Sequence, residues 1–174
     1  SQGLFPRPMN GKEIGWWSPA TRGIIPVDGL QISRSLQKHL KRFSIRVDSC
    51  FAQVMKACGD SRRPHGWINV DFIRAYSHLH AMGWAHSVEV FSGDDLVGGV
   101  YGVRVGKLFA GESMFHTQTD ASKAALVALV ALLDTTGIAL FDVQWTTPHL
   151  ESMGAIDIPR SDYLALLAQA QNRN

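Results

Sequence analysis

Glu112 is the first residue of this sequence whose type and surroundings suggest chemistry. It is a lone carboxylate within the segment FAGESMF, Phe109–Phe115, where its neighbours are apolar or small. A carboxylate buried without a partner is unfavourable or takes a shifted pKa, so Glu112 needs a partner or a task. The simpler alternative is that Glu112 points into solvent from an edge strand.

Asp142 and Gln144 form a second candidate group. They lie two residues apart in the segment IALFDVQ, residues 138–144, whose other residues are mostly apolar and predict a strand. Because side chains alternate across a strand, Asp142 and Gln144 project from the same face. The pair is therefore a candidate polar site on a largely apolar strand.

A glycine-rich segment, Leu96–Phe115, precedes this strand and predicts two strands joined by a tight turn at residues 105–107. Glycine within a strand usually marks a bulge or a close approach to the backbone. Gly98 and Gly99 therefore predict a bare surface beside Glu112 that can receive a ligand.

Basic residues gather in one short stretch, with no acidic residue between them. The members are Arg34, Lys38, Lys41, Arg42 and Arg46. Such a run is ordinarily the solvated face of a helix. A patch of one sign also attracts phosphate groups, so contact with a nucleic acid is the alternative.

Other chemistry-bearing residues predict less. Cys50 and Cys58 fall in an amphipathic pattern and are expected to be small core residues. His78 and His80 are two residues apart and lack acidic or thiol partners nearby, so we expect no zinc site. Trp16 and Trp17 either close the core or offer a stacking surface.

The composition limits the class of protein. The chain has 174 residues, 45% hydrophobic and 18% charged, with 17 basic against 15 acidic residues. These values exclude a disordered chain and predict one domain with a core. No apolar run reaches the roughly 18 residues of a transmembrane helix, so we expect no membrane partner. The start lacks the pattern of a signal peptide, and the two cysteines indicate a reducing compartment.

The predicted elements give a mixed α/β fold with a mostly antiparallel sheet and helices on both faces. Their order resembles that of the GNAT superfamily of acyltransferases. The turn that binds pyrophosphate there is glycine-rich, whereas residues 115–120 here contain no glycine and end at Asp120. We therefore expect no coenzyme A in the usual mode. Predicted strands cover 44–48, 84–91, the two halves of 96–115, and 138–144; predicted helices cover 35–42, 51–58, 70–82, 121–134, 146–153 and 162–171.

Seven motifs carry a closer resemblance. They are WWSP (16–19), ISRS (32–35), HSVEV (86–90), LVGGVYGV (96–103), LFAGESMF (108–115), ASKAAL (121–126) and FDVQ (141–144). In this order they resemble the leucyl/phenylalanyl-tRNA–protein transferase family along nearly the whole chain. The resemblance implies an enzyme that transfers Leu or Phe, with Met a further possible donor, from aminoacyl-tRNA to the α-amine of proteins beginning with Arg or Lys. It also implies a role in N-end-rule degradation in the bacterial cytoplasm, without metal or other cofactor.

The resemblance also assigns roles to residues. Gln144 contacts the attacking amine, Asp142 orients it, and Trp67 flanks the adenine or the aminoacyl group. Glu112 and Asp142 are the carboxylates expected to meet the cationic acceptor. The sequence leaves the proton acceptor open between the 2′-hydroxyl of the terminal adenosine and a water molecule.

Two surfaces complete this expectation. A pocket for the apolar donor side chain is expected from the hairpin, because Met adapts to either donor shape. Its lining is expected to be Val100, Phe109, Ser113, Met114, Phe115, Gly98 and Gly99. The surface facing the phosphates of the tRNA acceptor stem is expected to comprise Arg34, Lys38, Lys41, Arg42, Arg62 and Arg63.

We expect residues 1–30 to form an irregular N-terminal segment, a remnant of or junction to the small N-terminal domain that family members usually carry. Residues 31–174 are expected to form the GNAT-like catalytic domain, acting as a monomer. Two alternatives stay open. One is a GNAT-like N-acyltransferase that uses acyl-CoA, and the other is a non-catalytic module that binds N-terminal Arg or Lys.

Overall fold

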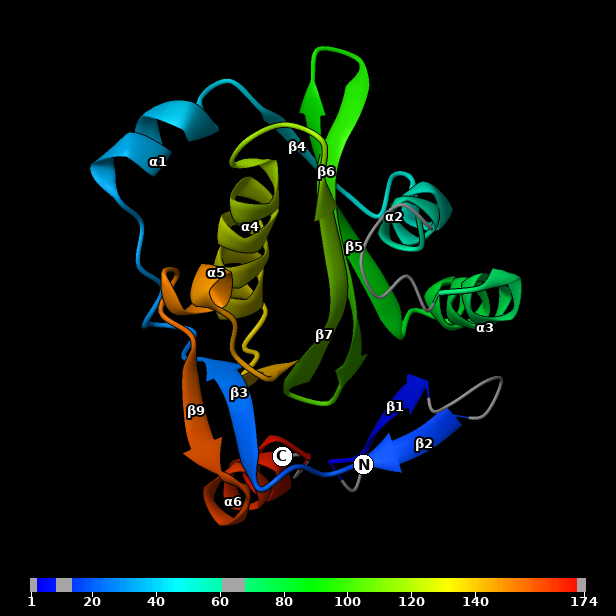
Figure 1. Ribbon diagram of the computed structural model, residues 1–174, viewed down its shortest axis with the longest axis vertical. Coiled ribbons are helices and arrows are strands. Elements are labelled where there is room, and N and C mark those ends of the chain that lie inside the picture. Colours follow the sequence, from blue (N-terminus) through cyan, green and yellow to red (C-terminus); the bar gives the residue numbers. More distant parts are fainter. Residues whose placement is uncertain (1–2, 9–13, 61–67, 172–174) are drawn as a thin grey trace.

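A seven-stranded sheet forms the centre of the molecule. The computed structural model describes residues 3–8, 14–60 and 68–171. Figure 1 shows the strands, whose order in the sheet is β4-β5-β6-β7-β8-β3-β9. Their bounds are β3 Thr21–Ile25, β4 Ser44–Val47, β5 Ala85–Ser92, β6 Asp95–Val105, β7 Leu108–His116, β8 Leu140–Gln144 and β9 Ile156–Pro159. A separate two-stranded sheet pairs β1 (Phe5–Pro8) with β2 (Ile14–Trp17).

Helices cover both faces of the sheet (Figure 1). The first layer contains α1 (Arg34–Leu40), α4 (Ala121–Thr135) and α5 (Pro148–Glu151). The opposite layer contains α2 (Phe51–Cys58) and α3 (Val70–Ala81), and α6 (Arg160–Gln171) packs on β3, β7 and β8. The predicted mixed α/β fold is therefore confirmed. No helix in the described ranges is long and apolar enough to cross a membrane.

The alternation of side chains along β6 explains the two layers. Val100 is buried in the core under α4, and its neighbour Tyr101 is buried in the core under α2 and α3. Because β6 is buried on both faces, it has no polar side of its own. The pattern of α4 is apolar nearly all round, and eight of its residues are buried against the sheet.

A β-bulge interrupts the pairing of β6 with β7. Tyr101 lies opposite Ser113 and Gly102 lies opposite Gly111, so Glu112 has no partner across the ladder. A bulge inserts one residue into a strand and turns its side chain relative to the pleat. The extra residue here is Glu112, the candidate for chemistry.

The two strands that carry the candidate residues run parallel, and every other neighbouring pair in the described sheet is antiparallel. β7 pairs with β8 only from Leu108↔Leu140 to Ala110↔Asp142. Beyond this point the two strands share no ladder, so Glu112 and Gln144 lie where the sheet opens.

Several predicted elements are confirmed with small shifts of their ends. α2 has the predicted bounds, Ser33 caps α1 by accepting a hydrogen bond from Leu36 N, and Asn69 caps α3 by accepting one from Phe72 N. The start of α4 has no side-chain cap among the described contacts. Asp120 holds the N-cap position with φ 67°, and its carboxylate instead contacts His39 Nδ1 at 2.6 Å.

The N-terminal region differs from the irregular segment expected over residues 1–30. It contains β1 and β2, which pair with each other, and β3, which is an inner strand of the main sheet. The short strand β9 was not predicted. β3 and β9 pair with each other across more than a hundred residues, so neither has a local hairpin signal that a sequence reading can use.

The bare surface expected at Gly98 and Gly99 is filled by the chain itself. A Cβ atom at Gly98 would meet Ala121 Cβ at 2.7 Å, and one at Gly99 would meet Phe115 Cε1 at 3.1 Å. These glycines allow α4 and the α2-side core to approach the sheet closely. The expectation of an open glycine surface was therefore wrong at both positions.

We expect Gly98→Ala to lower the free energy of unfolding by about 1–3 kcal/mol, because it overpacks the contact between β6 and α4. Urea denaturation measures the change. Adding Ala121→Gly should restore part of the loss, since it removes the nearest atom. Equal stability of wild type and Gly98→Ala would contradict the close packing.

Candidate active site

Glu112 is held at the point where the sheet opens by two hydrogen-bond donors. The Tyr76 hydroxyl of α3 and the Gln144 side chain of β8 both donate to its carboxylate. The pKa of Glu112 is raised to about 7, first by desolvation and then by the charge of Asp142. The two hydrogen bonds and the charge of Arg22 act in the opposite direction. Glu112 can therefore gain or lose a proton near neutral pH.

Asp142 has a contrasting environment, because it is paired with Arg22 of β3. Arg22 Nε and Nη2 donate to the two carboxylate oxygens at 2.9 and 2.6 Å, and the Tyr163 hydroxyl of α6 donates at 2.8 Å. Arg22 and Asp142 are only 4% and 1% exposed. This bidentate pair fixes Asp142 in one orientation. The pairing occupies the Asp142 carboxylate, whereas no cation among the described residues is bonded to Glu112.

Gln144 has an unusual backbone. Its φ is 70°, in the left-handed region that glutamine rarely adopts, and its N–H donates to Asp142 Oδ1 at 2.8 Å. Gly23 lies opposite, where a Cβ atom would meet the Trp145 backbone carbon at 2.5 Å. Strain of this kind costs about 1–3 kcal/mol and is typical of functional positions. The backbone turn directs the amide side chain toward Glu112.

The arrangement combines three capabilities in one place. Glu112 can exchange a proton, the Gln144 amide can orient a polar group, and the Asp142–Arg22 pair holds Gln144 in place. The prediction that Glu112, Asp142 and Gln144 lie together on neighbouring strands is confirmed. The described residues contain no group of three or more His, Cys, Asp and Glu side chains arranged to hold a metal ion.

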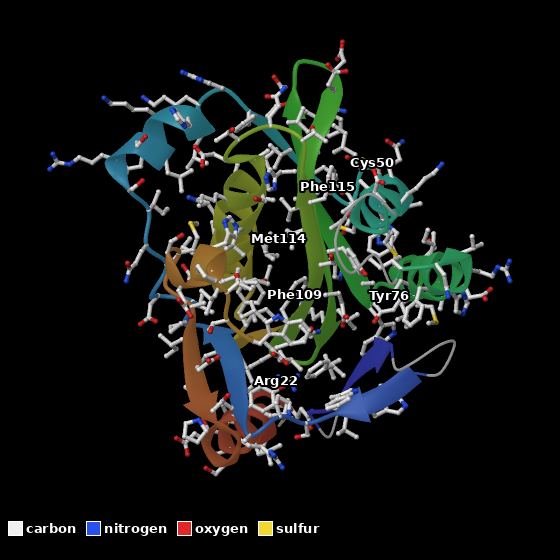
Figure 2. The ribbon with its side chains drawn as sticks, viewed as in Figure 1. Arg22, Cys50, Tyr76, Phe109, Met114 and Phe115 are labelled. Atoms are coloured by element: carbon white, nitrogen blue, oxygen red, sulfur yellow. The ribbon has the colours of Figure 1, made fainter. Side chains whose placement is uncertain are left out.

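The apolar residues predicted to line a donor pocket are distributed over both faces of the sheet. Val100 and Phe109 are buried in the core under α4, with Met114 partly buried beside them, and Phe115 is buried under α2. Ser113 is partly exposed. Figure 2 shows Met114 on the α4 side of the sheet and Tyr76 on the α3 side. These side chains therefore do not form one common wall.

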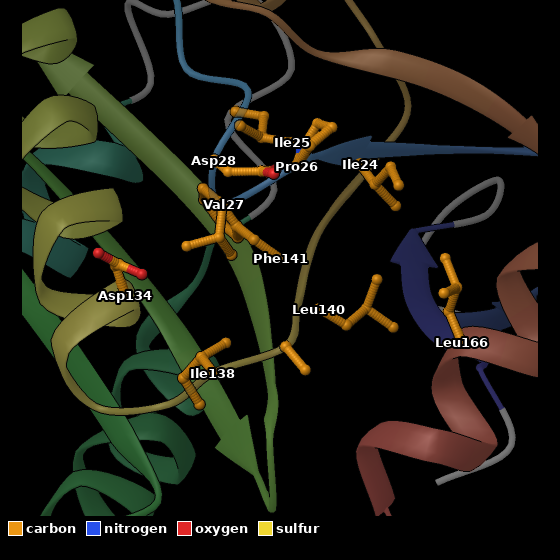
Figure 3. Close-up of a pocket in the computed structure, with 11 residues that line it drawn as sticks. Ile24, Ile25, Pro26, Val27, Asp28, Asp134, Ile138, Leu140, Phe141 and Leu166 are labelled. Atoms are coloured by element: carbon orange, nitrogen blue, oxygen red, sulfur yellow. The ribbon is translucent and has the colours of Figure 1, made fainter.

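A pocket of about 340 Å³ lies instead beside the start of β8 (Figure 3). Its lining is Ile24, Ile25, Pro26, Val27, Asp28, Asp134, Ile138, Ala139, Leu140, Phe141 and Leu166. None of these is Glu112, Asp142 or Gln144. The pocket shares β3 and β8 with the candidate site but lies at the N-terminal end of β8, whereas Asp142 and Gln144 lie toward its C-terminal end.

The predicted basic surface is divided between described and undescribed residues. Arg34, Lys38, Lys41 and Arg42 are exposed on or just after α1, in the α4 layer. Arg62, Arg63 and Trp67 lie outside the described residues, so their predicted roles stay predictions.

The sequence of the chain matches a known family over most of its length. The family is described as leucyl/phenylalanyl-tRNA protein transferase, and the match spans residues 24–168. The chain belongs to this family. A relative with that name from Cereibacter sphaeroides is 50% identical over 172 residues, covering 97% of this chain and 79% of the relative. One from Herpetosiphon aurantiacus is 49% identical, covering 98% of this chain and 89% of the relative.

Solved structures of other proteins share the fold at low sequence identity. FemX has a TM-score of 0.59 at 9% identity, covering 81% of this chain and 60% of FemX. A GCN5-related glucosamine N-acetyltransferase region of a fungal enzyme has a TM-score of 0.54 at 10% identity, covering 80% of this chain and 20% of that protein. These similarities show that this member of the transferase family has a GNAT-like fold.

Three residues of the site were missed by sequence reasoning: Arg22, Tyr76 and Tyr163. Arg22 gave a signal, since it stands next to the apolar run Gly23–Ile25, where a cation needs a buried partner. Tyr76 fits the apolar spacing of the predicted helix over residues 70–82, which indicates a core residue rather than a site residue. Tyr163 gave no signal, because its partner Asp142 lies on a strand twenty-one residues earlier.

The raised pKa of Glu112 predicts a pH dependence of stability. Glu112 binds its proton more tightly in the folded state than in the unfolded state, where its pKa has the ordinary value of 4.5. The free energy of unfolding therefore falls as the pH rises from 4.5 to 7. We expect wild type to lose up to roughly 3 kcal/mol relative to Glu112→Gln over this range.

Urea denaturation at pH 5, 6, 7 and 8 measures this difference. Glu151→Gln changes an exposed carboxylate on α5 and is the control, which should run parallel to wild type. If wild type and Glu112→Gln differ by the same free energy of unfolding at every pH, the raised pKa of Glu112 is contradicted.

Proposed function

We propose that this chain transfers Leu or Phe from aminoacyl-tRNA to the N-terminal α-amine of proteins that begin with Arg or Lys. Membership of the transferase family supports the reaction class. The observation that carries the proposal is the meeting of Glu112, Asp142 and Gln144 where β7 and β8 separate. We further propose that the products enter N-end-rule degradation, and that the enzyme acts in the cytoplasm as a monomer.

The reaction needs no nucleophile from the enzyme, because the aminoacyl ester of tRNA is already activated. The neutral α-amine of the acceptor attacks the ester carbonyl, the new C–N bond forms, and the C–O bond to the ribose breaks. The amine loses a proton and the ribose oxygen gains one, so the enzyme must hold the amine and pass a proton. For the same reason we propose that the reaction uses no metal and no cofactor beyond the aminoacyl-tRNA.

Gln144 and Glu112 suit these two tasks. A neutral amide is a poor base, so Gln144 orients the amine by hydrogen bonding. Glu112 has a pKa of about 7 and is ionised in a substantial fraction of molecules at neutral pH. We propose that ionised Glu112 holds the amine and receives its proton on the way to the ribose oxygen. Asp142 acts by fixing Gln144, as its contacts with Arg22 and with Gln144 N support.

The basic surface keeps its predicted assignment as a proposal, whereas the donor pocket keeps only part of its predicted lining. The phosphates of the tRNA acceptor stem contact the exposed basic residues of α1 and the segment after it. The donor side chain enters beside Ser113, which is partly exposed on β7 and lies opposite Tyr101 on the α2 and α3 side of the sheet. Selection of an acceptor beginning with Arg or Lys rests on Glu112, since Arg22 already occupies Asp142.

The start of α4 disfavours the acyl-CoA alternative. The N-cap residue Asp120 places a carboxylate at this helix end, 2.6 Å from His39 Nδ1 and 3.8 Å from Lys123 Nζ. A helix N-terminus binds pyrophosphate through unoccupied N–H groups and a favourable dipole. The Asp120 carboxylate lies at this helix end and repels an anion.

Gln144→Gly should separate stability from activity. Glycine adopts a φ of 70° without strain, so we expect stability to be unchanged or to rise by about 1 kcal/mol. The rate of Phe transfer from Phe-tRNA to a peptide beginning with Arg should fall about a hundredfold, because the amine is no longer positioned.

Gln144→Asn is the companion variant, because asparagine tolerates this backbone and keeps an amide on a shorter side chain. It should fold normally and show an intermediate loss. The proposed role of Gln144 fails if Gln144→Gly transfers Phe at the wild-type rate.

The basic surface is tested by changing Lys38, Lys41 and Arg42 together to Ala. We expect weaker tRNA binding. The slope of log K against log salt should be smaller in magnitude by about two to three, because each phosphate contact that is lost means about one counterion fewer is released on binding. Filter binding at several salt concentrations gives both quantities.

The matched control changes three exposed basic residues elsewhere, Lys56, Arg74 and Lys107, to Ala. It should keep the wild-type slope. If both triple variants behave alike, the α1 patch is only a solvated surface.

A further inference from the structure

The Tyr101 hydroxyl is a polar group for which packing gives no explanation. Tyr101 lies in the middle of β6 and is 0% exposed. Its hydroxyl is buried and has no hydrogen-bond partner in the described part of the chain. Leaving a buried donor unsatisfied costs about 1–3 kcal/mol, and phenylalanine would fill the same space without this cost.

The aromatic ring of Tyr101 is fixed by its neighbours. The ring of Phe51 packs edge-on at a centroid distance of 5.8 Å, and that of Tyr76 packs edge-on at 5.7 Å. These contacts hold the ring within the core under α2 and α3. The hydroxyl therefore has a set position and little freedom to find another partner.

Of the charged groups around the Tyr101 hydroxyl, Glu112 has the largest electrostatic effect on it. Desolvation is the main reason that the pKa of Tyr101 is raised, and the charge of Glu112 is the next cause, ahead of Cys58 and Tyr76. The pairing of the strands explains the proximity. Tyr101 lies opposite Ser113, directly beside the bulge that inserts Glu112.

The Glu112 carboxylate has room for a further donor. An ionised carboxylate has about four acceptor positions, and among the described residues only Tyr76 and Gln144 donate to it through side chains. Arg22, the described cation whose charge acts on Glu112, donates instead to Asp142 and to the Gly3 carbonyl. A carboxylate buried without a bonded cation needs several donors to carry its charge.

We propose that the Tyr101 hydroxyl is the third hydrogen-bond donor of ionised Glu112, and that Tyr101 is a positioning residue of this site. A small shift of the Glu112 side chain within its bulge, or one bridging water molecule, completes the contact. Tyr76 and Tyr101 then hold the charge together, and Gln144 is freed to turn its amide toward the attacking amine. The step from Glu112 to the reaction depends on the proposed function, but the hydrogen bond itself does not.

Tyr101→Phe tests the proposal directly on Glu112. Carbon-13 NMR of labelled glutamate carboxyls follows the titration of Glu112 in the free protein, and Glu112→Gln identifies its signal. We expect Tyr101→Phe to move the midpoint upward by about one pH unit, because it removes a hydrogen bond to the charged form. At pH 5, where Glu112 is protonated, the melting temperature should stay the same or rise, because an unsatisfied hydroxyl is removed. Relative to wild type it should then fall as the pH rises to 8, because ionised Glu112 has lost a donor.

Phe51→Leu is the matched control, because it loosens the same core without removing a donor. It should lower the melting temperature and leave the Glu112 midpoint in place. An unchanged midpoint in Tyr101→Phe, or a melting-temperature difference from wild type that is the same at pH 5 and pH 8, would overturn the proposal.

The pH profile of kcat/KM for Phe transfer provides the second measurement. Its lower midpoint should shift with the NMR midpoint in Tyr101→Phe. If the NMR midpoint moves and no transfer occurs even in wild type, the hydrogen bond stands and the proposed function fails. If transfer occurs and neither midpoint moves, the proposed function stands and the role of Tyr101 fails.

Discussion

The buried ion pair between Arg22 and Asp142 is the interaction on which the candidate site depends. Two charges that are almost fully shielded from solvent need complete hydrogen bonding to be tolerated. The Asp142 carboxylate accepts hydrogen bonds from Arg22, from the Tyr163 hydroxyl and from the N–H of Gln144. Arg22 also donates to the Gly3 carbonyl. Removal of one partner from such a pair typically costs about 3–5 kcal/mol, because the other charge stays buried. The pair therefore connects β3, β8, α6 and the N-terminal region around Gln144.

The two carboxylates of the site differ because their surroundings differ. Asp142 has a cation in direct contact, whereas the described donors to Glu112 are neutral and the negative charge of Asp142 lies close by. Desolvation without a bonded cation favours the protonated form and brings the pKa of Glu112 close to neutral pH. Environments that move the pKa values of two carboxyl groups apart in this way allow one carboxylate to orient its neighbours and the other to exchange a proton.

Local departures from regular strand geometry produce this arrangement. The bulge in β7 removes Glu112 from the ladder, and the left-handed backbone of Gln144 turns the end of β8. Both departures occur where β7 and β8 cease to pair. The glycines of β6 serve a different purpose, because they let α4 and the α2-side core pack close to the sheet. Strain at the opening is thus supported by dense packing on both sides.

The sequence by itself determined the fold class, most helices and strands, and the group Glu112, Asp142 and Gln144. These features follow from local periodicity, helix capping and the motifs of the transferase family, all of which are written in neighbouring residues. Only the tertiary structure decided that Arg22 neutralises Asp142, that Tyr76 bonds to Glu112, and that β3 and β9 join the main sheet. It also decided that Gly98 and Gly99 are filled by the chain. Each of these depends on residues far apart in sequence, whose approach is set by the packing of layers and leaves no local pattern.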